Sequence, residues 1–202
     1  MREKRKPLLL LGARQVGKTY LLEMNFGKKE FENFHKFDFR EDRKRLHSCF
    51  DGSLEPSVVI EKLSILSGRD INIQNSLILF DEIQECPQAL TSLKYFNEKM
   101  PNIYLCATGS YLGLHVQDES FPVGQVEMLH LFPMSFEEFL WASEDKKLIE
   151  IFNNMSRLAV SHDKLWEILT DYYFVGGLPE AVDSWFKEKH RPINERASLV
   201  QG

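Results

Sequence analysis

The stretch GARQVGKT, from Gly12 to Thr19, follows four consecutive leucines, Leu8 to Leu11, and matches the pattern G-x-x-x-x-G-K-[ST]. The glycines let the backbone curl so that successive N–H groups point at one anion. The apolar run before the motif predicts a buried strand, and the periodic residues after it predict a helix. The motif therefore predicts a phosphate-binding loop (P-loop) within an α/β fold.

Each part of this loop has an expected role toward ATP and Mg²⁺. Lys18 reaches the β- and γ-phosphates, which gives it a catalytic as well as a binding role, and the hydroxyl of Thr19 is a ligand for Mg²⁺. The helix expected to begin at Lys18 adds the positive end of its dipole. The residues expected to contact the nucleotide are Gly12, Ala13, Arg14, Gln15, Val16, Gly17, Lys18, Thr19 and Tyr20. A glycine-rich turn without a ligand is the alternative.

The segment LILFDE, from Leu77 to Glu82, is an apolar strand that ends in two carboxylates. Asp81 is expected to hold Mg²⁺, directly or through water, as the Walker B acid. Glu82 is placed to orient and deprotonate the attacking water, and it is the expected catalytic base. Because carboxylates end many strands as solvated groups, this assignment depends on the P-loop that precedes it.

A third apolar run, Asn102–Thr108, ends in the triplet Thr-Gly-Ser. A polar side chain on the strand beside the Walker B strand commonly contacts the γ-phosphate or the attacking water in P-loop ATPases. Thr108 and Ser110 are therefore candidate catalytic residues. The alternative is that the triplet serves only as a loop between a strand and a helix.

Short β-type runs alternate with helical stretches along the first two thirds of the chain, which is typical of a parallel sheet covered by helices. The expected strands are Leu8–Gly12, Phe34–Phe39, Ser76–Asp81, Asn102–Thr108 and Val126–Leu131. The expected helices are Lys18–Phe26, Asp42–Phe50, Pro56–Ser67 and Gln88–Met100. We therefore predict a P-loop NTPase three-layer sandwich with a mostly parallel five-stranded sheet.

After about Leu131 the strand signals stop and the pattern becomes helical. Ser135 and Glu138 form a capping box ahead of an apolar stretch. A second helix is predicted by apolar residues at i, i+3, i+4, i+7 and i+8, and Pro179 suits the first turn of a third. We expect an ATPase core over residues 1–132 and a small helical lid within residues 133–202.

The composition excludes several classes of protein. The net charge of −5 argues against broad affinity for nucleic acid, and the basic cluster Arg40–Arg45 is interrupted by acids, which favours a solvated helix face. The Leu8–Leu11 run is too short for a signal peptide or a membrane span. Three cysteines without metal-ligand spacing fit a reducing compartment. The sequence predicts a cytoplasmic protein with no membrane partner.

Several motifs together resemble a prokaryotic AAA+-type ATPase family that carries an extra C-terminal domain of unknown function. The matching segments are GARQVGKT, LILFDEIQ, the TGS that ends its strand, LFPMSFEEFL (Leu131–Leu140) and YFVGGLPEAV (Tyr173–Val182). The resemblance implies an ATPase core of the additional-strand, catalytic-glutamate type followed by a helical lid. It also implies a further C-terminal domain, so that this chain is expected to be an N-terminal portion of a longer protein.

One position departs from the resemblance. Family members often carry Gly-Arg shortly before the strand that leads to the SFEEF segment, whereas this chain has Gly124-Gln125. If that arginine acts on the γ-phosphate of a neighbouring molecule, this chain lacks it there. Arg14, inside the P-loop, is then the arginine to consider as a phosphate or partner contact. The alternative is that Arg14 forms half of a structural salt bridge.

The leading functional hypothesis is an ATPase whose hydrolysis drives or switches a conformational change on a protein or nucleic-acid partner. Assembly of several copies of the chain is left open. One rival is a nucleotide-gated scaffold or nucleic-acid-binding module with negligible turnover. Another is a small-molecule kinase, which the adjacent Asp81 and Glu82 disfavour because a kinase has little need for a water-activating glutamate.

Overall fold

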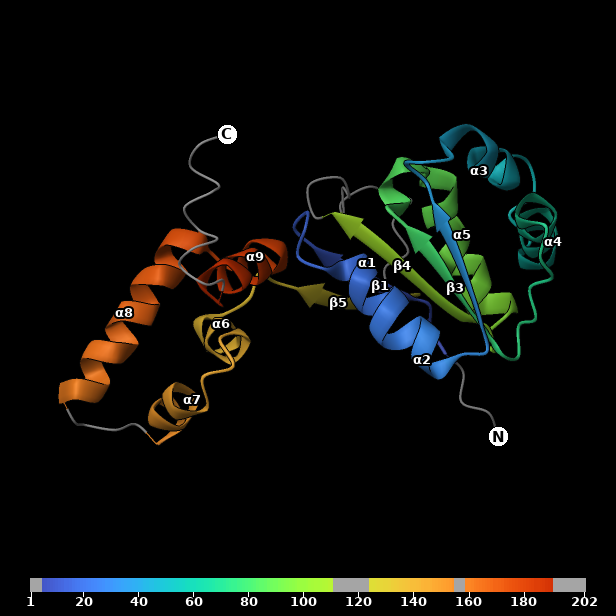
Figure 1. The fold of residues 1–202 in the computed structure, drawn as a ribbon. Coiled ribbons are helices and arrows are strands. Elements are labelled where there is room, and N and C mark those ends of the chain that lie inside the picture. Colours follow the sequence, from blue (N-terminus) through green and yellow to red (C-terminus); the bar gives the residue numbers. More distant parts are fainter. Residues whose placement is uncertain (1–4, 111–123, 155–158, 191–202) are drawn as a thin grey trace. The chain divides into compact units, whose positions relative to one another are not determined.

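The chain is described by a computed structural model that covers residues 5–110, 124–154 and 159–190 (Figure 1). Contacts within the chain group into two units, which divide between Leu131 and Phe132. The first unit contains a sheet and its covering helices, and the second is helical. Among the described residues, no helix is both long and apolar enough to cross a membrane.

The first unit is built on a five-stranded sheet with the order β2-β3-β4-β1-β5, in which every pairing is parallel. Its strands are β1 (Leu8–Gly12), β2 (Asn33–Asp38), β3 (Ser76–Asp81), β4 (Tyr104–Ser110) and β5 (Glu127–Leu131). The predicted α/β fold class is confirmed. Because β4 lies between β1 and β3, the additional strand implied by the family resemblance is present, and the carboxyl ends of these three strands lie side by side.

The two faces of the sheet bury alternate residues of each strand, as the twofold period of a strand requires. On one face, strand residues such as Leu9, Ile78 and Phe80 pack with α3 (Arg43–Phe50), α4 (Pro56–Ser67) and α5 (Pro87–Lys99) (Figure 1). On the other face, strand residues that include Leu10 and Leu79 pack with Leu22. The sheet is thus the middle of three layers.

Leu22 belongs to a continuous helical segment that follows the P-loop. This segment consists of α1 (Lys18–Tyr20), the π-helical η1 (Leu21–Gly27) and α2 (Lys28–Glu30). A Cβ atom on Gly27 would lie 2.4 Å from the ring of Phe34, so the glycine lets the helix pass close to β2. The predicted helix Lys18–Phe26 is present, although most of it has π rather than α geometry.

The second unit contains α6 (Phe136–Ala142), α7 (Lys146–Asn153), α8 (Ala159–Val175) and α9 (Pro179–His190). The predicted capping box is confirmed, since the Ser135 hydroxyl accepts from the Glu138 N–H at 3.3 Å and the Glu138 carboxylate accepts from the Ser135 N–H at 2.7 Å. The core of this unit consists of Phe139, Leu140, Ile168, Val182 and Phe186. The short helix α7, which begins after the capping side chain of Asp145, was not predicted from the sequence.

Gly177 generates a prediction about the stability of the helical unit. A Cβ atom there would lie 2.2 Å from the Met134 carbonyl oxygen, and the Gly177 carbonyl accepts from the Met134 N–H at 2.7 Å. Gly177→Ala should therefore lower the free energy of unfolding by about 1–3 kcal/mol, the usual range for overpacking.

Urea denaturation followed by tryptophan fluorescence reports on this unit alone, because the three tryptophans, Trp141, Trp166 and Trp185, all lie in it. The control is Gly176→Asn, which introduces a side chain that tolerates the left-handed φ of 77° into open space, and its effect should be below about 0.5 kcal/mol. Equal midpoints for Gly177→Ala and the parent would show that the close approach is not required.

Candidate functional site

The P-loop begins where β1 ends and turns back into α1. A Cβ atom on Gly12 would lie 2.2 Å from the Leu131 carbonyl oxygen, so only glycine fits between β1 and β5. Gln15 and Gly17 have left-handed φ angles of 65° and 91°, which curl the loop. The side chain of Val16 is buried and anchors the loop to the unit's interior. Local sequence thus produces the predicted concave backbone.

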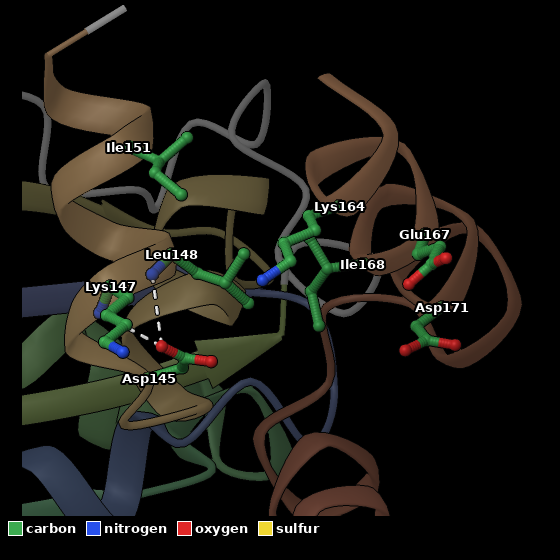
Figure 2. Close-up of a pocket in the computed structure, with 8 residues that line it drawn as sticks. All are labelled: Asp145, Lys147, Leu148, Ile151, Lys164, Glu167, Ile168 and Asp171. Atoms are coloured by element: carbon green, nitrogen blue, oxygen red, sulfur yellow. Dashed lines mark hydrogen bonds between the residues drawn. The ribbon is translucent and has the colours of Figure 1, made fainter. Parts of the chain in front are cut away.

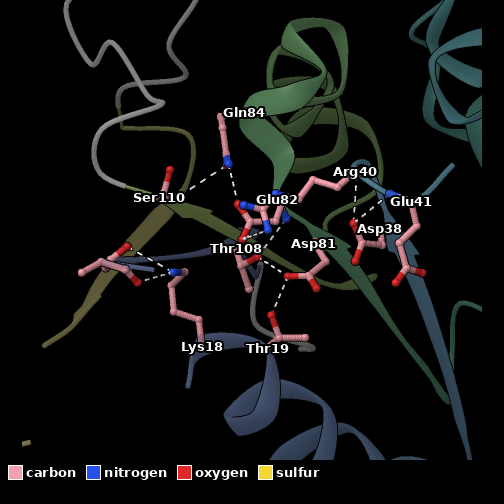
Figure 3. A network of polar contacts seen from close by, with 12 residues as sticks. Lys18, Thr19, Asp38, Arg40, Glu41, Asp81, Glu82, Gln84, Thr108 and Ser110 are labelled. Carbon is pink, nitrogen blue, oxygen red and sulfur yellow. Dashed lines mark hydrogen bonds and ion pairs between the residues drawn. The ribbon is translucent and has the colours of Figure 1, made fainter. Parts of the chain in front are cut away.

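Lys18 is 5% exposed and points back into the loop, where its Nζ donates to the carbonyl oxygens of Gly12 at 3.1 Å and Ala13 at 2.7 Å (Figure 3). Burial lowers the pKa of Lys18, although the carboxylates of Glu82 and Asp81 act in the opposite direction. Both hydrogen-bond acceptors are neutral groups. A phosphate against this loop would supply the counter-charge that the carbonyls cannot, so the site fits an anionic ligand.

The carboxylate of Asp81, at the end of β3, is 3% exposed and joins three segments of the chain. Its Oδ1 accepts from the Thr19 hydroxyl at 2.8 Å and from the Thr108 hydroxyl. Its Oδ2 lies 3.4 Å from the Nζ of Lys36 on β2. The hydroxyl and the carboxylate that the sequence analysis expected to share Mg²⁺ are therefore in contact. One hydroxyl and one carboxylate oxygen suit a cation that binds few protein groups and completes its shell with phosphate and water.

Lys36 is a member of this cluster that the sequence analysis did not identify. Burial lowers its pKa, but the carboxylates of Asp81, Asp38 and Glu23 together outweigh burial and raise the pKa of Lys36 above the ordinary value. The side chain is consequently an ammonium that faces the Walker B acid. The alternation of Lys36 and Asp38 on a strand was the only signal in the sequence, and it gives no partner without the order of the strands.

Glu82 leaves β3 with a φ of 55°, a left-handed conformation that is uncommon for a residue with a side chain. Its backbone N–H donates to the Thr108 hydroxyl at 3.0 Å. Its carboxylate Oε1 lies 3.7 Å from Nη1 of Arg40, and its Oε2 accepts from the Nε2 of Gln84 (Figure 3). The strained turn directs the side chain toward the carboxyl end of β4, where Thr108 and Ser110 lie.

Thr108 and Ser110 are both buried, and each belongs to the polar network. The Thr108 hydroxyl donates to Asp81 and accepts from the N–H of Glu82, so that it fixes the two acids relative to each other. The backbone N–H of Ser110 donates to Oε1 of Gln84 at 3.3 Å. Contact of either hydroxyl with a γ-phosphate stays a prediction.

Other candidates from the sequence lie at the margin of this network. Tyr20 is 64% exposed and Arg14 is exposed. The interpretation of the whole Arg40–Arg45 cluster as a helix face was wrong for Arg40, because α3 begins only at Arg43 and Arg40 faces Glu82. Gln125, at the position where the family often has arginine, accepts from the Nδ2 of Asn97 at 2.6 Å.

A separate pocket of about 280 Å³ lies between α7 and α8 in the helical unit (Figure 2). Its charged lining residues are Asp145, Lys147, Lys164, Glu167 and Asp171. The Asp145 carboxylate is already engaged, since it accepts from the backbone N–H groups of Lys147 and Leu148 at 3.0 and 3.1 Å. The pocket contains none of the residues predicted to act on a nucleotide.

Comparison with known proteins places this geometry in context. A family model described as an AAA domain matches residues 4–140. No curated protein matches the chain. Among solved structures, "Structure of Drosophila ORC bound to DNA" is similar with 15% sequence identity and a TM-score of 0.46, over 91% of this chain and 54% of that chain. The chain thus spans about half the length of that chain.

The burial of Lys18 generates a prediction about binding. Lys18→Ala should weaken the affinity for Mg·ATP by about 2–4 kcal/mol, because it removes one partner of a desolvated charge pair. Isothermal titration calorimetry measures the loss. Lys28→Ala is the matched control, since Lys28 is exposed on α2 and pairs with Glu23 at 2.7 Å. A Lys18 variant that binds as tightly as the control would contradict the assignment of the P-loop.

Proposed function

The chain belongs to the AAA domain family of nucleotide-binding P-loop ATPases, and from this premise we propose that it hydrolyses ATP with Mg²⁺ to drive or switch a conformational change on a partner. The observation that carries the proposal is the contact network of Asp81. In this network the hydroxyls of Thr19 in the P-loop segment and Thr108 on β4 both donate to the Asp81 carboxylate at the end of β3. A binding loop alone does not require this convergence, whereas a metal-assisted reaction does.

Different residues of this chain have different roles in the proposed reaction. The backbone N–H groups of the P-loop and the ammonium of Lys18 bind and orient the phosphates. The hydroxyl of Thr19 and the carboxylate of Asp81 would hold Mg²⁺, which when bound supplies charge neutralisation on the phosphate oxygens. Thr108 keeps Asp81 and Glu82 in a fixed relation. These side chains come from three segments, the P-loop with α1, the end of β3 and β4, which the parallel sheet brings together.

Glu82 is the group that we propose takes the proton from the attacking water. Its side chain is 13% exposed, which leaves it accessible from the site while most bulk solvent is excluded. A carboxylate within hydrogen-bond reach of the water accelerates such a step by about 10²–10⁴-fold. Because the water itself is the acceptor of the phosphoryl group, the presence of this base favours hydrolysis over the small-molecule kinase alternative.

A second candidate function is a nucleotide-gated scaffold with negligible turnover. The contact of Arg40 with Oε1 of Glu82 favours it, because both carboxylate oxygens then face positive or donor groups of the protein. A base in this environment needs Arg40 to withdraw before it can take a proton. The two candidates differ in phosphate release, which is measured without any added acceptor.

The partner and the compartment are part of the same proposal. A net charge of −5 favours a partner recognised through a limited surface over broad attraction to nucleic acid. We place the protein in the cytoplasm, a reducing compartment, because Cys49, Cys86 and Cys106 are free and buried. Burial raises the pKa of Cys106 to about 12, which keeps this thiol protonated and unreactive. We also propose that residues 1–132 are the ATPase core and that the helices after them are its lid.

The role of Glu82 generates a prediction that separates binding from chemistry. Glu82→Gln keeps the size and hydrogen bonding of the side chain but removes the base, so affinity for ATP should stay within about threefold while turnover falls by about 10² or more. The control is Glu85→Gln, because Glu85 faces the exposed Arg43 at 3.7 Å and lies outside the network. Steady-state phosphate release that is the same in the Glu82 variant and the parent would exclude the base role.

A further inference from the structure

Gln84 connects two parts of the site that the proposed mechanism treats separately. It lies in η2 (Ile83–Glu85), the short turn that follows Glu82. Its Nε2 donates to Oε2 of Glu82, and its Oε1 accepts from the backbone N–H of Ser110 at 3.3 Å (Figure 3). One half-buried amide thus spans the distance between the carboxyl end of β4 and the carboxylate of the expected base.

The chemistry of the two contacts fixes the orientation of this amide. A backbone N–H can only donate, and an ionised carboxylate can only accept. Gln84 must therefore direct its oxygen to Ser110 and its nitrogen to Glu82. A glutamate in its place would lack the donor and repel Glu82, whereas a lysine would lack the acceptor. The side chain also adds no charge to a site that already holds several.

The Gln84 amide makes the two carboxylate oxygens of Glu82 inequivalent, because it donates a hydrogen bond to only one of them. Oε2 is engaged by a hydrogen bond from Gln84, whereas Oε1 is 3.7 Å from Arg40, which is beyond hydrogen-bond distance. Oε1 faces Arg40 as an ion pair without a hydrogen bond, so it is the oxygen that can take a proton once Arg40 withdraws. The backbone of Glu82 is held from the same strand, since its N–H donates to the Thr108 hydroxyl. Both ends of Glu82 are therefore positioned by β4.

We propose that Gln84 is a positioning residue. It ties the Glu82 carboxylate to the end of β4 in the orientation that presents Oε1 to the attacking water. This inference rests on the proposed ATPase function. Gln84 touches neither phosphate nor water in this role and acts only through Glu82. A displacement of the Ser110 N–H would move the amide and, with it, the carboxylate. The carboxyl end of β4 would thereby control the alignment of the base.

The test is a double-mutant cycle between Gln84→Leu and Glu82→Gln on the 202-residue chain. Single-turnover hydrolysis of ATP with Mg²⁺ gives the rate, and calorimetry gives the affinity. Gln84→Leu should lower the rate about 10- to 100-fold, because small misplacements of a reacting group have effects of this size. Its affinity for ATP should stay within about threefold of the parent. In the Glu82→Gln background the same change should alter the rate less than about twofold.

Two further variants make the result specific. Gln84→Glu retains an acceptor for the Ser110 N–H, so it preserves the contact with β4 and tests the donor alone if the leucine variant does not fold. It should slow hydrolysis at least as much as Gln84→Leu. The matched control is Gln88→Leu, because Gln88 lies four residues away, is exposed and has its side-chain contact with Cys86. Its rate should equal that of the parent.

The possible results have different consequences for the role of Gln84 and for the proposed ATPase function. Equal rates for the parent and both Gln84 variants, with the parent active, would overturn the role of Gln84 and leave the ATPase function intact. If Gln84→Leu lowers the rate equally with and without Glu82, Gln84 acts through another group. That result would also overturn the proposal that Gln84 positions Glu82. A parent with no more hydrolysis than Glu82→Gln would overturn the proposed function and this inference with it.

Discussion

The site depends on a single buried carboxylate oxygen, Oδ1 of Asp81, which accepts hydrogen bonds from Thr19 and Thr108. An ionised group in the interior is destabilising unless it is paired and hydrogen-bonded. The two hydroxyls and the ammonium of Lys36 meet that requirement here. Because these partners come from the segment after β1, from β4 and from β2, the carboxylate can be satisfied only when β2, β3, β4 and β1 are assembled in the observed order.

The two acids of the site are surrounded by cations. Lys18, Lys36 and Arg40 face Asp81 and Glu82, and Lys36 also pairs with Asp38 and Glu23. The ammonium of Lys18 is directed to neutral carbonyls, while Lys36 and Arg40 contact the acids. A bound triphosphate would supply a negatively charged partner for Lys18, and it would compete for the cations that now contact the acids. The same groups can therefore support the empty and the loaded state by changing partners.

The fold was largely predictable because its signals are local. β1, β3 and α4 have the bounds that apolar runs and flanking breakers predict, and the Ser135 capping box is a four-residue pattern. The contacts of Lys36, Arg40 and Gln84 were not predictable. Each joins segments whose proximity depends on the order of the strands, and a charged or amide side chain carries no sequence mark of its partner. The π geometry of η1 was missed because a helical period of apolar residues does not distinguish i→i+4 from i→i+5 hydrogen bonding.

The most direct test of this account is a crystal structure of the chain with Mg²⁺ and a non-hydrolysable ATP analogue. The account predicts phosphates against the backbone of Gly12–Thr19, with the metal bound to the Thr19 hydroxyl and lying within one water of the Asp81 carboxylate. It also predicts that Oε1 of Glu82 faces the γ-phosphate through a water molecule. A nucleotide bound elsewhere, or a metal that contacts neither Thr19 nor Asp81, would contradict it.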